Sequence, residues 1–126
     1  MTQEQYKEFR EDFTSIVWYR GQVTAKKTWI GALGKWDKNN SHKAKIEEAI
    51  RELAELRKIV ADKLAKYDKT YDELKAISKQ LSVFNQRIKI TDSNYEKYKA
   101  LGLKHKINSA KGAQLTAQLN FKQFSI

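Results

Sequence analysis

Two lysine-rich segments carry the chemistry that this sequence most plainly offers, which is the binding of anions. Residues 20–45 hold seven basic side chains against one acidic side chain, and residues 97–126 hold six lysines and no acid. Residues 46–96 hold ten of each sign and residues 1–19 carry a charge of −2, so the positive excess behind the net charge of +10 lies in the two lysine-rich segments. An uncompensated basic segment favours approach to phosphate groups or to an acidic protein surface. The alternative is that the lysines only keep the chain soluble, but their segregation favours binding.

The candidate contacts form two patches. The first patch comprises Arg20, Lys26, Lys27, Lys35, Lys38, Lys43 and Lys45. The second patch comprises Lys97, Lys99, Lys104, Lys106 and Lys111. Lysine is a flexible point charge, whereas arginine presents the planar fork that reads base edges in pairs of hydrogen bonds. The excess of lysine therefore predicts contacts to nucleic-acid backbones with weak sequence preference, or to an acidic protein.

Three tryptophans add an aromatic element to the first basic segment. At about 100° per residue, Trp18, Trp29 and Trp36 fall within ~20° of one another on a helix that continues through residue 36. Three explanations are open. This face packs against another helix or a second subunit, or the helix breaks near Gly21 and the faces cannot be compared, or the rings are exposed for binding. In the last case Trp29 and Trp36 are candidate stacking platforms for bases.

Catalytic equipment is sparse, so we expect a non-catalytic protein. The two histidines, His42 and His105, are far apart and lie in basic stretches without a carboxylate to orient either ring. The sequence contains no HExxH, GxSxG, P-loop or GxGxxG pattern. Without cysteine it has no disulfide, no cysteine-based zinc site and no thiol nucleophile. We expect neither a cofactor nor a metal site.

The same composition bears on the compartment. No apolar run approaches the ~18 residues that a membrane span needs, and the first twelve residues are too polar for the core of a signal peptide. A chain without cysteine suits a reducing environment. We therefore expect a cytoplasmic protein, of a cell or of an infected host, that does not bind membranes.

The elements that must position these residues are predicted to be helices, so the fold class is all-α, an elongated helical bundle in a single domain of residues 1–126. Thr2 and Gln5 match a capping box that starts an N-terminal helix or helix pair within residues 1–36. Gly31 and Gly34 predict that this helix ends before Trp36. Residues 37–40 read as a loop, and Asn40 or Ser41 is expected to cap the next helix. The apolar stripe of the first helix comprises Tyr6, Phe9, Phe13, Ile16, Tyr19 and Val23.

A seam with coiled-coil spacing follows and predicts a long central helix over 42–89. Thr70 and Glu73 match a second capping box, which favours the alternative of a helical hairpin broken near 68–70, with 42–67 against 71–89. The unbroken heptad phase favours continuity. A seam of this length needs another helix of the chain, a partner or a second copy. Its apolar members are Ile46, Ile50, Leu53, Val60, Leu64, Tyr67, Tyr71, Leu74, Leu81 and Ile88.

The basic C-terminal segment, 92–126, is the hardest to assign. Thr91 and Asp92 are expected to cap a short helix that Gly102 ends. Residues 115–122 alternate as in a strand, but a lone strand has no evident partner, so a helix over 109–120 is favoured. The tail with Phe121, Phe124 and Ile126 is expected to dock on the rest of the chain.

These features support two hypotheses of function. In the first, the protein binds DNA or RNA through backbone phosphates. In the second, it is an interaction or assembly module that uses the seam and meets an acidic protein partner with its basic ends. An oligomer, or an inhibitor of the kind that phages and mobile elements encode, belongs to this second class.

Overall fold

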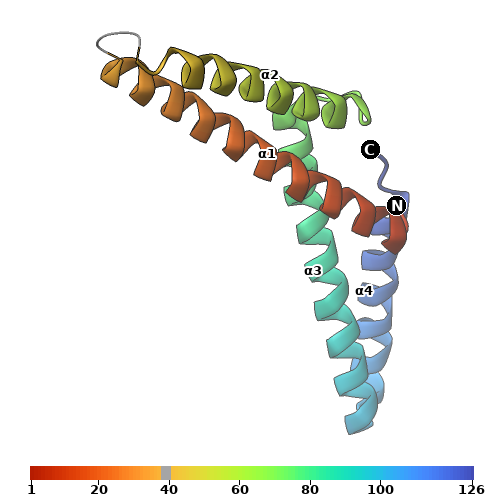
Figure 1. The fold of residues 1–126 in the computed structure, drawn as a ribbon. Helices are drawn as coiled ribbons and strands as arrows, with labels where there is room; N and C mark the ends of the chain where they lie inside the picture. Colours follow the sequence, from red (N-terminus) through yellow and green to blue (C-terminus); the bar gives the residue numbers. More distant parts are fainter. Residues whose placement is uncertain (38–40) are drawn as a thin grey trace. The chain divides into compact units, whose positions relative to one another are not determined.

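The structure, a computed structural model, describes residues 1–37 and 41–126. These residues form four helices and no strand, which confirms the all-α class. The helices are α1 (Gln3–Trp36), α2 (Lys43–Ala65), α3 (Tyr71–Leu101) and α4 (Lys104–Gln123) (Figure 1). Their contacts divide the chain into two compact units. One unit contains Met1–Arg10 and Asp72–Ile126, and the other contains Glu11–Tyr71.

The N-terminal capping box is confirmed. The Thr2 backbone N–H donates to Gln5 Oε1 at 2.9 Å, and the Gln5 N–H donates to Thr2 Oγ1 at 3.1 Å. These two bonds satisfy donors that the first turn of a helix leaves free. Helix α1 therefore starts where the sequence predicts.

Helix α1 continues past its three glycines to Trp36, so the predicted early end and the alternative of a break at Gly21 are both wrong. A Cβ added at Gly21, Gly31 or Gly34 would have no neighbour within 4 Å, so none of these glycines is required by a close contact. One glycine in a helix interior costs only about 1 kcal/mol. The packing of the buried residues Ile16 and Leu33 offsets this cost.

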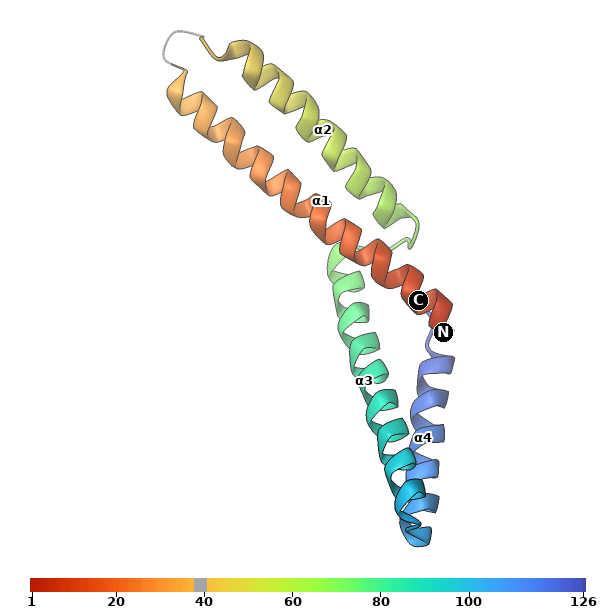
Figure 2. The same cartoon turned by 60° about the horizontal axis from the view of Figure 1, so that its bottom comes forward.

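In the unit Glu11–Tyr71, α1 and α2 form a helical hairpin, and they lie side by side in both views (Figures 1 and 2). Ile16 and Leu33 of α1 and Ala49 and Leu53 of α2 are buried. Helix α2 begins after His42, whose side chain forms no cap and whose backbone N–H donates to Asp37 Oδ1 at 3.0 Å.

The capping predicted for Ser41 is therefore wrong, because the N-cap position falls one residue later, at His42. The alternative cap, Asn40, and most of the predicted loop 37–40 lie outside the described residues.

The favoured single helix over 42–89 is wrong, and the alternative break near 68–70 is confirmed. The backbone N–H groups of Tyr67 and Asp68 bond to Leu64 O at 3.1 Å and Ala65 O at 3.2 Å, and Asp68 adopts a positive φ of 51°. Helix α3 then begins directly after Thr70, as the second capping box predicts. In place of the proposed hairpin of 42–67 against 71–89, α2 pairs with α1, and α3 belongs to the unit of α4.

The unit of α3 and α4 is a second helical hairpin (Figures 1 and 2). As predicted, Gly102 ends α3, with a φ of 66°. The N–H of Gly102 bonds to Lys99 O at 3.2 Å and that of Leu103 to Tyr98 O at 3.1 Å, which is a Schellman motif. Only Gly102 and Leu103 therefore separate the two helices.

Two expectations for the C-terminal segment need correction. Thr91 caps no helix, because it is buried within α3 and its hydroxyl donates to the carbonyls of Arg87 at 2.9 Å and Ile88 at 3.0 Å. The strand alternative over 115–122 is also wrong, because these residues belong to α4. The preferred helix over 109–120 is confirmed and begins five residues earlier, at Lys104.

The core of this unit also holds the start of α1. The rings of Tyr6 and Phe121 meet edge to face with their centroids 5.6 Å apart. The expected docking of the tail is confirmed by the Phe84–Phe124 contact at 5.8 Å. The Met1 amino group donates to the carbonyls of Phe121, Lys122 and Phe124 at 2.6–3.0 Å. A positive charge at the C-terminus of α4 complements its dipole. The remaining buried residues here are Phe9, Leu74, Leu81, Ala110 and Ala117.

Candidate nucleic-acid interface

The second basic patch is gathered at the turn of the α3–α4 hairpin. Lys97 and Lys99 lie in the last turns of α3, and Lys104 and Lys106 lie in the first turn of α4, across the two-residue connection. All four side chains are exposed, as is Lys111 further along α4. No acidic residue occurs from 97 to 126. The fold thus brings these lysines to one end of the hairpin, where the exposed Glu96 before Lys97 is the nearest acid in sequence.

The first basic patch is brought to the turn of the α1–α2 hairpin only in part. Lys35 lies in the last turn of α1, and Lys43 and Lys45 lie in the first turn of α2, all exposed. Glu47 and Glu48 follow in the next turn, so this end is less strongly basic than the end of α3–α4. Lys38 lies outside the described residues.

Two members of the first patch are engaged within the chain. Lys26 forms an ion pair with Glu52 of α2. The Arg20 guanidinium lies over the ring of Tyr71, with its carbon 3.6 Å from the ring centroid. Arg20 and Lys26 thus have partners within the α1–α2 unit, whereas Lys27 is exposed.

The three tryptophans are exposed on α1. Their exposed fractions are 58% for Trp18, 46% for Trp29 and 59% for Trp36. The rings of Trp29 and Trp36 touch edge to face, with centroids 6.2 Å apart. Helix α1 is unbroken, so the three rings do share one face, and no described residue buries that face.

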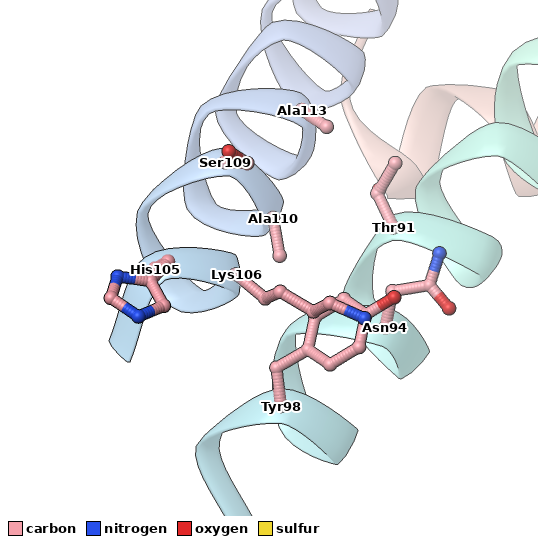
Figure 3. A pocket seen from close by; sticks show the side chains of 8 residues that line it. All are labelled: Thr91, Asn94, Tyr98, His105, Lys106, Ser109, Ala110 and Ala113. Atoms are coloured by element: carbon pink, nitrogen blue, oxygen red, sulfur yellow. The ribbon is translucent and has the colours of Figure 1, made fainter. Parts of the chain in front are cut away.

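A hollow of about 320 Å³ lies next to the basic end of α3–α4. Figure 3 shows Lys106 reaching from α4 toward the ring of Tyr98 on α3, with Ala110 and Ala113 pointing from α4 toward α3. The Lys106 ammonium is 5.4 Å from the centroid of that ring. The hollow is lined by Thr91, Asn94, Tyr98, His105, Lys106, Ser109, Ala110 and Ala113.

A second hollow of about 440 Å³ shares Thr91 and Ala113 with the first, so the two form one groove along the hairpin. We call it the α3–α4 groove. Arg87 contributes a cation to the second hollow. The other residues of this hollow are Val83, Phe84, Gly112, Thr116, Ala117 and Asn120.

Asp92, the acid of α3 nearest to both hollows in sequence, lies on another side of the hairpin. At about 100° per residue it is more than 100° around the helix from Tyr98 and from Arg87. Its carboxylate accepts hydrogen bonds from Gln114 at 2.9 Å and Gln118 at 3.4 Å. The groove therefore carries cations without that acid.

Sequence reasoning did not find the groove, because it exists only once α3 and α4 are paired. One signal was available. Small residues recur on α4 at Ser109, Gly112, Ala113 and Thr116, which is the spacing of one helix face. That spacing indicates a face without bulk, but it does not say which helix lies opposite or what fills the space.

The predicted interaction seam is mostly used inside the two units. Leu53, Leu74 and Leu81 are buried, and Ile50 is half exposed. The other members, Ile46, Val60, Leu64, Tyr67, Tyr71 and Ile88, are partly buried.

One carboxylate of the α1–α2 unit has a shifted pKa. Burial acts to raise the pKa of Asp12, but hydrogen bonds from Lys66 and Tyr67 and the charges of Lys66 and Lys63 outweigh it, so the pKa lies below the ordinary value of 3.8. The Lys66 Nζ to Asp12 Oδ2 distance is 2.8 Å. This cluster joins α1 to the end of α2 and is structural in character.

Metal sites, membrane spans and relatives add no further assignment. Within 1–37 and 41–126, no three His, Asp or Glu side chains gather closely enough to hold a metal ion. No helix of the described chain has the length and hydropathy to cross a membrane. No family model, curated protein or solved structure matches the chain.

Proposed function

We propose that the protein binds nucleic acid through backbone phosphates, with the turn of the α3–α4 hairpin as its main contact. The observation that carries the proposal is the gathering of Lys97, Lys99, Lys104 and Lys106 around a two-residue turn. Exposed lysines without acids between them attract a polyanion and release its counterions on binding. The α1–α2 end, with Lys35, supplies a second and weaker contact.

Lysine in place of arginine sets the expected mode of binding. Lysine contacts phosphate as a point charge and does not read base edges in pairs of hydrogen bonds. Affinity should therefore depend little on sequence and should fall steeply with salt.

The test compares two variants that change the net charge equally. Lys97→Gln with Lys104→Gln removes two charges from the hairpin end, and Lys58→Gln with Lys75→Gln removes two exposed charges from the neutral centre. Binding of a fluorescent DNA or RNA oligomer is measured by anisotropy at several salt concentrations. The slope of log K against log salt is negative, and we expect the first variant to make it shallower by about 1.5–2. The second variant should leave the slope unchanged. Equal effects of the two variants would contradict the proposal.

A second function is supported by a separate observation, the exposure of Trp18, Trp29 and Trp36 along one face of α1. An apolar stripe about 27 Å long at ~1.5 Å per residue fits a helix of a partner or of a second copy. Light scattering after size-exclusion chromatography distinguishes this assembly function. A defined dimer that Trp18→Gln and Trp29→Gln together dissociate would support it, and a monomer at all concentrations would count against self-assembly.

A further inference from the structure

The α3–α4 groove differs from the basic surface around it because it is hollow and has an aromatic wall. Phosphate binding alone needs exposed cations and no cavity. The hollow of about 320 Å³ at Tyr98 lies at the lower end of the range for ligand sites, which run from about 300 to about 1,000 Å³. Its α4 wall combines the small residues Ser109, Ala110 and Ala113 with the longer side chains of His105 and Lys106.

We infer that this hollow receives an unpaired base of a single-stranded segment, whose flanking phosphates bind the lysines at the turn. The inference rests on the proposed function and names its substrate class, single-stranded rather than duplex nucleic acid. Proteins that bind single strands without strong sequence preference combine a basic track with aromatic rings on which bases stack. Tyr98 supplies the ring here, and Lys106 supplies the adjoining charge.

The position of Lys106 is compatible with a base stacked on Tyr98 and with a phosphate bound beside it. Its ammonium lies 5.4 Å from the centroid of the Tyr98 ring. A stacked base would take this place, and the flexible stem of lysine lets the ammonium move to the phosphate of the same nucleotide. The exposed amide of Asn94 lies at the rim and can exchange hydrogen bonds with the edge of any base. A duplex would keep its bases stacked and could not enter the hollow.

The second hollow extends the site along the hairpin and repeats its composition. Arg87 and Phe84 both line it, and the ring of Phe84 also contacts that of Phe124. Tyr98 and Phe84 are 14 residues apart on α3, which is about 21 Å along the helix axis. That length suits a strand of a few nucleotides running from the basic turn toward the other end of the groove. The placement of Asp92 on another side of the hairpin keeps this path free of that acid.

The test fills the hollow without changing its charge. Ala113→Leu adds bulk at an exposed helical position that lines both hollows. Asn108→Leu adds a leucine at an exposed position of α4 outside them and is the matched control. Anisotropy is measured with a short oligothymidine, its RNA counterpart and a hairpin duplex of equal length, at one low salt concentration. Circular dichroism checks that both variants remain helical.

We expect the original protein to prefer the single strands, and Ala113→Leu to weaken their binding about tenfold. Duplex binding should stay within about twofold, and Asn108→Leu should behave as the original protein. An unchanged single-strand affinity in Ala113→Leu, or an equal loss for strand and duplex, overturns the inference while the phosphate contacts of the proposed function stand. A change in the mass of the protein in solution, with strand binding intact, would show that the groove seats protein, which also overturns it. If no oligomer binds in a salt-dependent way, the proposed function itself fails.

Discussion

Lys26 of α1 forms an ion pair with Glu52 of α2, whereas its neighbour in sequence, Lys27, is exposed. The two residues are equivalent in the sequence, since both belong to the same basic run. In the fold they differ, because the charge of Lys26 is balanced inside the hairpin. A lysine that already has an acidic partner releases fewer counterions when a polyanion binds.

This pair allows a prediction about which lysines of the first patch contact phosphate. Lys27→Gln should make the negative slope of log K against log salt shallower by about 0.7–0.9. The double variant Lys26→Gln with Glu52→Gln removes the pair without changing the net charge and should leave the slope unchanged. Anisotropy titrations with one oligomer at four salt concentrations measure both slopes. If the double variant makes the slope shallower by as much as Lys27→Gln does, Lys26 contacts the nucleic acid despite its ion pair with Glu52.

The parts of the fold that depend on neighbours in sequence were predictable. The Thr2–Gln5 box places the start of α1, and Gly102 places the end of α3, because capping involves residues within one or two turns. The separation of charge was also readable from the sequence, because each basic segment flanks or contains a turn between helices.

The parts that depend on pairing between helices were not predictable. The heptad phase from Ile46 to Ile88 continues across the break at 66–70, because residues in two successive helices can keep the same spacing without sharing one axis. The groove likewise needs Tyr98 of α3 opposite Ala113 of α4. The glycines of α1 misled the prediction because their cost of about 1 kcal/mol each is smaller than the contribution of a packed helix face.

Acid should weaken the α1–α2 unit through Asp12. Its folded-state pKa lies below the unfolded value of 3.8, so its carboxylate contributes stability above that value and loses it as the pH falls through the folded-state pKa. Asp12→Asn should lower the free energy of unfolding by about 1 kcal/mol near neutral pH, and the difference should vanish in strong acid. Urea unfolding at neutral pH and near pH 2 measures it, with exposed Asp62→Asn as the control. If Asp12→Asn lowers the free energy of unfolding equally at both pH values, the charge of Asp12 is not the cause of the loss.

Two glycines should respond oppositely to alanine. Gly102 has a φ of 66°, which a side chain opposes, so Gly102→Ala should lower the free energy of unfolding by about 1 kcal/mol. Gly31 lies inside α1 with open space where a Cβ would point, so Gly31→Ala should raise it by about 0.5–1 kcal/mol. Thermal or urea unfolding checks both signs. If Gly31→Ala instead lowers the free energy of unfolding, another molecule, such as a second copy of the chain, contacts this position.

Tryptophan fluorescence should report whether bases stack at the α1–α2 end. Trp29 and Trp36 lie near Lys35 and touch each other, whereas Trp18 is 11 residues before Trp29, about 16 Å along the helix axis. If the pair stacks on bases, an oligothymidine should quench the fluorescence of Trp18→Phe, which keeps the pair. It should leave the variant with Trp29→Phe and Trp36→Phe almost unquenched. Equal quenching in both variants would show that the quenching does not come from bases stacked on Trp29 and Trp36. No quenching together with a dimeric mass would assign the tryptophan face to assembly, because rings buried between two copies are closed to bases.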